Sequence, residues 1–241
     1  MKEKLKKILN NPSKALLYLS TAFKKRFGPK KGVLVFVGMD PGGEFNILYP
    51  GYKICYGFEA NPDRFQKLSK KFAQKKNIRL FNCAIANYDG EIEFNISSNN
   101  DGASSSIGTF NEEWQNNTNV QMVKKIKIPC INLNNFLEKE KITYVDDYIS
   151  DIQGMDLEVL KSLRPMIEKK QIGNIKCEVT KDIYKNIYSD LPDNSETGFN
   201  KLLNDNYKMI SRGHGLLVDN KFEKISDDVW EMDCKWTLKQ H

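Results

Sequence analysis

The chain has 241 residues, of which 40% are hydrophobic, so it can bury one substantial core but hardly two independent ones. Its formal net charge is +6, and the first 31 residues hold ten of the 37 Lys and Arg side chains with a single acid. The rest of the chain, with 27 basic and 30 acidic residues, is slightly acidic. This distribution disfavours a basic nucleic-acid footprint, and we expect no nucleic-acid partner.

The apolar runs and the cysteines argue against further classes. The longest apolar run, residues 33–37, is far short of the about 20 residues that cross a bilayer. No small-residue cleavage site follows the basic N-terminus, so we expect a cytoplasmic protein without a secretory signal. The five cysteines are widely spaced and include no CxxC pair, which indicates buried thiols rather than a disulfide framework or a metal site.

Residues 1–31 are predicted to form a basic helical arm in two pieces, followed by a single domain over residues 32–241. Pro12 occupies a favoured first position for the second piece. That piece spaces Leu16, Leu19, Ala22 and Phe23 along one face, so we expect this face to pack against other residues. Weak contact of the arm with an anionic membrane surface is the alternative interpretation.

Beyond the arm, apolar runs alternate with helical periodicity, as in a parallel sheet with crossover helices. Strands are expected at 33–37, 53–58, 78–83, 123–130, 148–152 and 172–179, and helices at 61–76, 133–139, 155–168 and 199–204. The segments 207–211 and 229–236 can close the sheet as an antiparallel edge pair. The dipeptide Asp89-Gly90 predicts a hairpin, and the polar residues 97–119 are numerous enough to form a lid.

A glycine-containing turn follows the first strand and reads Gly38-Met39-Asp40-Pro41-Gly42-Gly43. Such a turn lets a ligand approach the backbone at the start of a helix. The second strand ends at Glu59, where a carboxylate can accept hydrogen bonds from both hydroxyls of a ribose. Because the glycines are not spaced as G-x-G-x-x-G, the two features favour S-adenosyl-L-methionine over a dinucleotide.

A later strand delivers Asp151 to its carboxyl end, and Gly154 allows a tight turn into the next helix. The carboxyl ends of parallel strands share one edge of a sheet. We therefore expect Asp151 to face the same crevice as Asp40 and Glu59. The alternative is that Asp151 only caps the helix that begins near Met155.

These stretches together resemble the FkbM family of S-adenosylmethionine-dependent methyltransferases. The resemblance rests on Phe58-Glu59-Ala-Asn-Pro62, Asn82-Cys-Ala-Ile-Ala86, Asp151-Ile-Gln-Gly-Met-Asp-Leu-Glu-Val-Leu160 and Cys177-Glu178-Val179. It implies an α/β fold of the Rossmann-like class I methyltransferase type, with a mostly parallel seven-stranded sheet, an antiparallel edge strand and helices on both faces. Such proteins mostly methylate hydroxyl groups of sugars and related natural products, which implies a small-molecule or glycan acceptor.

The resemblance also implies roles for single residues. Glu59, with Ala60 beside it, would hold the ribose, and Asp151 would lie by the sulfonium. The adenine would be lined by Asn82, Cys83 and Ala84, and a serine-containing segment, 103–107, would cover the site. As the group that orients or deprotonates the acceptor we expect Asp151, with His214 as the second candidate.

Two departures from the family pattern keep an alternative open. The family's first motif usually has an acid, a hydrophobe, Gly-Ala-Asn, a variable residue and Gly. Residues 37–43 lack the acid unless Asp40 replaces it. The Lys that commonly lies two residues before the motif Asp is Ile149 here. The alternative function is therefore a catalytically silent binding protein with the same fold.

Two other interpretations are disfavoured. A nicotinamide-dependent oxidoreductase would need the third glycine of its turn and a Tyr-x-x-x-Lys pair. A magnesium site made of Asp151, Asp156 and Glu178 is disfavoured because Asp156 falls within the helix turn and Glu178 on another strand.

Overall fold

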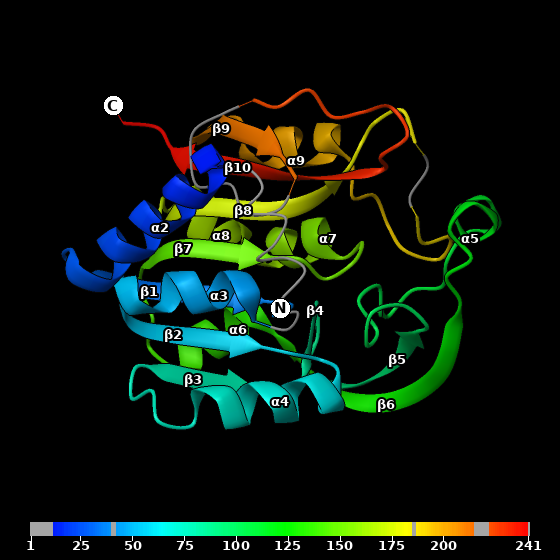
Figure 1. Cartoon of the computed structure of the whole chain (residues 1–241), viewed down its shortest axis with the longest axis horizontal. Coiled ribbons are helices and arrows are strands. Elements are labelled where there is room, and N and C mark those ends of the chain that lie inside the picture. Colours follow the sequence, from blue (N-terminus) through cyan, green and yellow to red (C-terminus); the bar gives the residue numbers. More distant parts are fainter. Residues whose placement is uncertain (1–11, 40–41, 185–186, 215–221, 241) are drawn as a thin grey trace.

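A seven-stranded sheet forms the centre of the molecule (Figure 1). The structure is a computed structural model that describes residues 12–39, 42–184, 187–214 and 222–240. The strands of this sheet are β1 (Lys31–Val37), β2 (Tyr52–Phe58), β3 (Ile78–Phe81), β7 (Val145–Ser150), β8 (Ile172–Thr180), β9 (Tyr207–Gly213) and β10 (Glu231–Leu238). Their order is β3-β2-β1-β7-β8-β10-β9, and β10 runs antiparallel to both of its neighbours. The expected mostly parallel sheet of seven strands is confirmed.

Helices cover both faces of this sheet. On one face lie α3 (Gly43–Leu48) and α4 (Pro62–Phe72), and on the other lie α6 (Leu133–Lys139), α7 (Asp156–Ser162), α8 (Arg164–Glu168) and α9 (Glu196–Leu203) (Figure 1). Alternate residues of β1 serve the two cores: Leu34 and Phe36 pack with α3 and α4, whereas Val35 and Val37 join the larger core on the other face. The single helix expected at 155–168 is two helices, with a proline in the first turn of α8.

The tail forms the edge of the sheet, as expected, with β9 outermost and β10 inserted between β8 and β9. In this register, Glu231 lies opposite Thr180, the last residue of β8. An antiparallel strand begins at the edge where its parallel neighbours end. The first residue of β10 is therefore brought to the carboxyl ends of the central strands.

A separate three-stranded sheet corrects the predicted hairpin. It contains β4 (Ala84–Ala86), β6 (Met122–Asn132) and β5 (Gly90–Ser97), in that order. Both β4 and β5 pair with β6, so they do not form a hairpin with each other across Asp89-Gly90. The Asp89 side chain instead accepts hydrogen bonds from the backbone N of Asn132 at 2.9 Å and the Nδ2 of Asn135 at 2.7 Å.

The polar segment expected to be a lid is more ordered than its sequence indicates. It contains a short helix, α5 (Glu112–Thr118), whose N-cap is Asn111. The part before α5 is tied to the rest of the fold, because Arg64 donates hydrogen bonds to the carbonyl oxygens of Asn100 and Asp101. In addition, Ser106 Oγ donates to the carbonyl oxygen of Gln153 at 2.7 Å.

Helix α2 (Pro12–Phe27) contacts α3 and the 3₁₀ turn η1 (Tyr49–Gly51). Two residues of the face that was expected to pack, Leu19 and Phe23, are 63% and 65% exposed, whereas Ala22 is half-buried and the Leu16 side chain lies outside the described part. Lys25 of α2 does contact the domain: its side chain lies against Gly51 of η1, and its ammonium lies 4.9 Å from the centre of the Tyr52 ring in β2. Within the described residues, no helix has the length and apolar character required to cross a membrane.

Candidate active site

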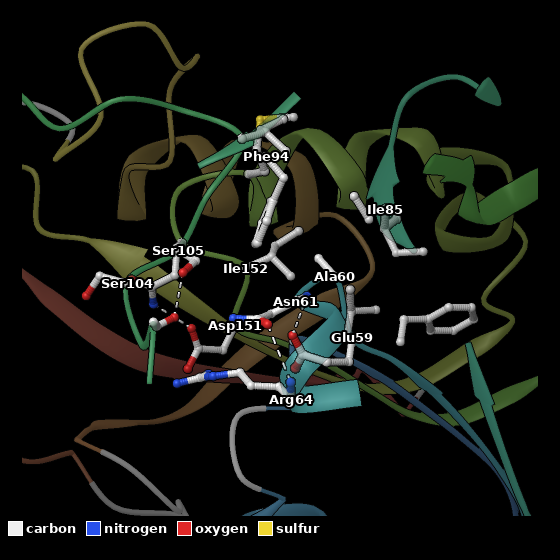
Figure 2. A pocket seen from close by; sticks show the side chains of 18 of the residues that line it. Glu59, Ala60, Asn61, Arg64, Ile85, Phe94, Ser104, Ser105, Asp151 and Ile152 are labelled. Carbon is white, nitrogen blue, oxygen red and sulfur yellow. Dashed lines mark hydrogen bonds between the residues drawn. The ribbon is translucent and has the colours of Figure 1, made fainter. Parts of the chain in front are cut away.

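A cavity of about 300 Å³ opens at the carboxyl ends of β1, β2, β7 and β8. Figure 2 shows side chains from the segment after β2, the start of α4, the three-stranded sheet and the loops after β5 and β7 gathered around it. Its polar lining includes Glu59, Asn61, Arg64, Ser104, Ser105, Asp151, Gln153, Glu178 and Glu231, and its apolar lining includes Phe58, Ile85, Phe94, Ile107 and Ile152. Apolar side chains and four carboxylates therefore line the same cavity.

Glu59 is held rigidly at the end of β2. Its side chain is buried and accepts hydrogen bonds from the backbone N of Met39 at 3.2 Å and of Asn61 at 2.9 Å. The Asn82 side chain donates to the carbonyl oxygens of Glu59 and Ala60, at 2.8 and 3.2 Å. Glu59 also lines the cavity, so its carboxylate borders the space in which a ligand can bind.

Gly38 allows β1 and β7 to approach closely at the cavity. It has a φ of 75°, and a Cβ there would lie 1.8 Å from the carbonyl oxygen of Asp151. The backbone N of Asp151 in turn donates to the carbonyl oxygen of Val37 at 3.0 Å. No side chain larger than that of glycine fits this position.

The structure brings only some of the predicted cofactor residues to the cavity. Those that line it are Gly38, Glu59, Ala60, Cys83, Ala84 and Asp151. Asn82 does not line it and instead fixes the backbone around Glu59. Asp40 and Pro41 lie outside the described residues.

The rest of the predicted glycine turn is structural. The Met39 side chain is buried in the core on the α3 side and lies against Gly57. A Cβ on Gly42 would meet Leu68 of α4 at 2.7 Å, whereas Gly43 has open space around it. Contrary to expectation, neither Gly42 nor Gly43 lines the cavity, because the chain turns into α3 behind it.

Asp156, rather than Asp151, stabilises the turn after β7. It is fully buried and accepts hydrogen bonds from Ser150 Oγ at 2.5 Å and the backbone N of Ile152 at 3.3 Å. Burial raises the pKa of Asp156 to about 8. The alternative role of Asp151 as a helix cap is not seen, since Met155 is the N-cap residue of α7 and makes no side-chain cap bond.

Gln153 joins two of the carboxylates. Its Nε2 donates to Asp151 Oδ1 at 2.7 Å and to Glu178 Oε2 at 2.6 Å, while its Oε1 accepts from the Tyr188 hydroxyl at 3.0 Å. Burial and the neighbouring Asp151 and Glu231 carboxylates raise the pKa of Glu178 well above its ordinary value. Burial, followed by the charge of Asp151, also raises the pKa of Glu231, to about 8.

A second cavity has a volume of about 620 Å³. It shares Glu178 and Glu231 with the first cavity, and its walls include Trp114, Tyr184, Ile187, Trp230 and the predicted His214. Asp151 and His214 therefore do not lie together: one lines the first cavity and the other the second. No cluster of three or more His, Cys, Asp or Glu side chains suited to a metal ion occurs among the described residues.

Several cavity residues escaped the sequence analysis. Asn61 and Arg64 belong to the start of α4, where Asn61 accepts from the backbone N of Asp63 as the helix cap. That capping signal is visible in the sequence. Glu231 had no local signal, because only the insertion of β10 between β8 and β9 brings it to the site.

The two departures from the family pattern meet in space. The acid of the first motif lies two residues before its first glycine, so the corresponding residue here is Phe36, two before Gly38. The missing Lys lies two residues before the motif Asp, so the corresponding residue is Ile149, two before Asp151. These two residues are direct partners in the parallel register of β1 and β7. Both are buried in the core with α3 and α4. An apolar pair thus occupies both positions, on the face of the sheet away from α7.

Comparison with known proteins decides the family. The sequence matches the family described as Methyltransferase FkbM domain over residues 39–200. The chain belongs to this family. No curated protein matches the sequence.

Solved structures similar to this FkbM methyltransferase chain are distant in sequence. An FkbM methyltransferase from Methylobacillus flagellatus KT has 12% identity and a TM-score of 0.49 over 87% of this chain, which spans 43% of that protein. A rRNA methylase from Streptococcus thermophilus has 9% identity and a TM-score of 0.45, covering 92% of this chain and 95% of its own. TrmK from M. capricolum, solved with S-adenosylhomocysteine, has 10% identity and a TM-score of 0.42, and the match covers 90% of this chain and 66% of TrmK.

S-adenosyl-L-methionine is the cofactor of this family of class I methyltransferases, and the first cavity fits it. Gly38 lines the cavity and has no side chain, so a ligand can approach the backbone closely there. The Glu59 carboxylate in its lining is the type of group that accepts hydrogen bonds from ribose hydroxyls. The apolar side chains of Ile85, Phe94 and Ile107 provide the walls that an adenine needs.

Proposed function

We propose that the chain transfers the methyl group of S-adenosyl-L-methionine to a hydroxyl group of a small-molecule or glycan acceptor. The observation that carries this proposal is the pair of cavities that share Glu178 and Glu231. The first cavity has the features of a nucleoside site. The second has aromatic walls and opens toward the same carboxylates, as an acceptor site must.

In this proposal, Glu59 holds the ribose, and Cys83 and Ala84 lie against the adenine. Asp151 lies at the reacting end, where its carboxylate stabilises the positive sulfonium and orients the acceptor. When bound, the cofactor supplies an activated methyl group, so most of the rate enhancement comes from holding the acceptor oxygen in line with it.

The second cavity favours a ring-shaped, hydroxylated acceptor. The centres of the Tyr184 and Trp230 rings lie 4.4 Å apart with an interplanar angle of 8°, and Trp114 also belongs to the lining. Flat aromatic surfaces bind the faces of sugar or aromatic rings, and carboxylates accept hydrogen bonds from hydroxyls. Carboxylates at the junction repel phosphodiesters, so we propose a small molecule or glycan rather than RNA.

The test is methyl transfer from radiolabelled S-adenosyl-L-methionine to separate glycan, small-molecule and RNA fractions of the cell from which the chain comes. We expect label in the glycan or small-molecule fraction and its loss with Asp151→Ala. Label in RNA would contradict the acceptor class. Titration with S-adenosylhomocysteine provides the control, since an absence of binding at millimolar ligand would contradict the methyltransferase assignment itself.

The catalytically silent alternative rests on the two departures from the family pattern. Phe36 and Ile149 are buried against α3 and α4, and neither lines a cavity. Their replacement leaves Gly38, Glu59 and Asp151 at the site. This arrangement favours an active enzyme.

We also propose that α2, as part of a basic arm outside the methyltransferase domain, makes weak contact with an anionic lipid surface on the cytoplasmic side. Leu19, Phe23 and Phe27 are 63%, 65% and 68% exposed and lie four residues apart along one helical face. Exposed Lys24 and Arg26 flank this face. Apolar side chains bordered by cations suit the boundary between lipid headgroups and acyl chains.

A further inference from the structure

Glu231 differs from the other carboxylates at the junction of the two cavities. Gln153 donates a hydrogen bond to Asp151 and another to Glu178. By contrast, Oε1 of Glu231 is inaccessible to solvent, and no described group donates a hydrogen bond to it. A buried carboxylate oxygen without a donor is costly, so it needs a structural or chemical reason.

The place of Glu231 in the fold supplies a chemical reason. As the first residue of β10, it is brought to the carboxyl edge of the sheet opposite Thr180. There it lines both the cofactor cavity and the aromatic cavity. A group in this position can reach a hydroxyl that enters from the aromatic side and faces the cofactor side.

We propose that Glu231 is the general base that accepts the proton of the acceptor hydroxyl, and that the acceptor ring lies in the cavity walled by Trp114, Tyr184 and Trp230. This inference rests on the proposed function and deepens it. Of the two bases suggested by the sequence, Asp151 already shares Gln153 with Glu178, and His214 is exposed and lines only the second cavity.

The step balances in atoms and charge. The acceptor oxygen forms a bond to the methyl carbon as the bond between that carbon and sulfur breaks, and the electron pair of the broken bond stays on sulfur. The hydroxyl proton moves to the Glu231 carboxylate. The products are a methyl ether, S-adenosylhomocysteine and a neutral Glu231, which returns its proton to solvent.

The electrostatic surroundings suit a base that works near neutral pH. The pKa of Glu231 is raised to about 8. Burial is the largest cause, and the negative charges of Asp151, Asp156 and Asp233 add to it. Glu178 lies beside it, and the second cavity adds Glu113, Tyr184, His214 and Asp228 to its lining. A base is most effective when its pKa lies near the working pH, and a nearby sulfonium favours the ionised form.

The first experiment compares the wild type with Glu231→Gln and with the matched control Glu223→Gln, which changes an exposed glutamate on the segment before β10. The measured rate is methyl transfer to the acceptor fraction between pH 6 and 9. We expect a roughly 100- to 10,000-fold loss in Glu231→Gln, with S-adenosylhomocysteine affinity unchanged within about twofold. The control should match the wild type.

The second experiment does not depend on turnover. Calorimetric titration with S-adenosyl-L-methionine at pH 7.5, in buffers of different ionisation enthalpy, counts the protons released on binding. We expect the wild type to release a larger fraction of a proton than Glu231→Gln, because the sulfonium lowers the pKa of Glu231. Retained S-adenosylhomocysteine binding shows that the variant is folded.

The outcomes separate the two claims. If the wild type binds no S-adenosylhomocysteine or transfers no methyl group, the proposed function fails and the inference fails with it. If the wild type is active and Glu231→Gln keeps its rate within a few-fold, only the inference is overturned.

The aromatic cavity has a separate test. Trp230→Ala should raise the acceptor KM at least tenfold at unchanged cofactor affinity. An unchanged KM would contradict that placement.

Discussion

Phe36 and Ile149 occupy the two positions where the family pattern has charged residues, and they are partners across β1 and β7. Their joint replacement is therefore one structural change rather than two losses of function. In a core this well buried, an acid or a lysine alone is an unpaired charge, whereas the two together neutralise each other.

This interpretation predicts strong coupling between the two positions. Phe36→Asp and Ile149→Lys should each lower the free energy of unfolding by about 3–5 kcal/mol, because each buries an unpaired charge. In the double variant, the decrease in the free energy of unfolding should be smaller than the sum of the two single decreases, by about 1 kcal/mol or more. Urea unfolding measures all four proteins of the cycle. Purely additive losses would show that the two side chains do not face each other.

A pair of glycines tests the close approach of β1 and β7. Gly38→Ala should destabilise the protein by more than about 2 kcal/mol and abolish S-adenosylhomocysteine binding, since the new Cβ collides with the Asp151 backbone at a positive φ. Gly43→Ala is the matched control, because it has open space around it, and it should change stability by less than about 1 kcal/mol. Equal effects at the two positions would contradict this geometry.

The buried carboxyl of Asp156 predicts a pH dependence of stability. Its folded pKa, about 8, lies above the ordinary 3.8 because of burial. The stabilisation from its bound proton is fully present below pH about 4 and is lost as the pH rises through 8. Asp156→Asn should therefore flatten the decline in free energy of unfolding between pH 5 and 9. The same slope in both proteins would mean that Asp156 titrates normally.

At the level of elements, α2 carries an apolar face that the domain leaves uncovered. Replacing Leu19, Phe23 and Phe27 together with Ser should leave the melting temperature nearly unchanged, since all three are exposed. It should also abolish co-sedimentation with vesicles containing anionic lipid. Ile183→Ser, which changes an exposed apolar residue elsewhere, is the control. A clear loss of stability in the triple variant would show that this face packs within the protein.

Sequence patterns predicted the elements that alternate regularly and missed those that depend on distant partners. The helix expected at 133–139 has those bounds in the structure, because its cap and periodicity are local. The hairpin at Asp89-Gly90 was wrong, because β6, more than 30 residues further on, pairs with both flanking strands. Helix α5 lacked a buried face and so gave no apolar periodicity.

At the scale of the whole molecule, the first cavity is built largely from locally encoded residues, whereas the second depends on contacts between distant parts of the chain. Gly38, Glu59 and Asp151 are local signals, each at the end of a predictable parallel strand, and the sheet topology brings them together. Glu231 and the aromatic cavity depend on β10 and on loops from three parts of the chain. No short-range pattern encodes such an arrangement. Local sequence patterns therefore indicated the residues at the ends of the parallel strands that line the first cavity, but not the residues that line the second.

The central claim is that the cofactor and acceptor cavities meet at Glu178 and Glu231. A crystal structure of the protein with S-adenosylhomocysteine tests it most directly. We predict that the ribose hydroxyls lie within hydrogen-bond distance of Glu59 and that the sulfur points toward Glu178 and Glu231, with the aromatic cavity open beyond it. A sulfur atom directed away from these glutamates, or a ribose without contact to Glu59, would contradict the account.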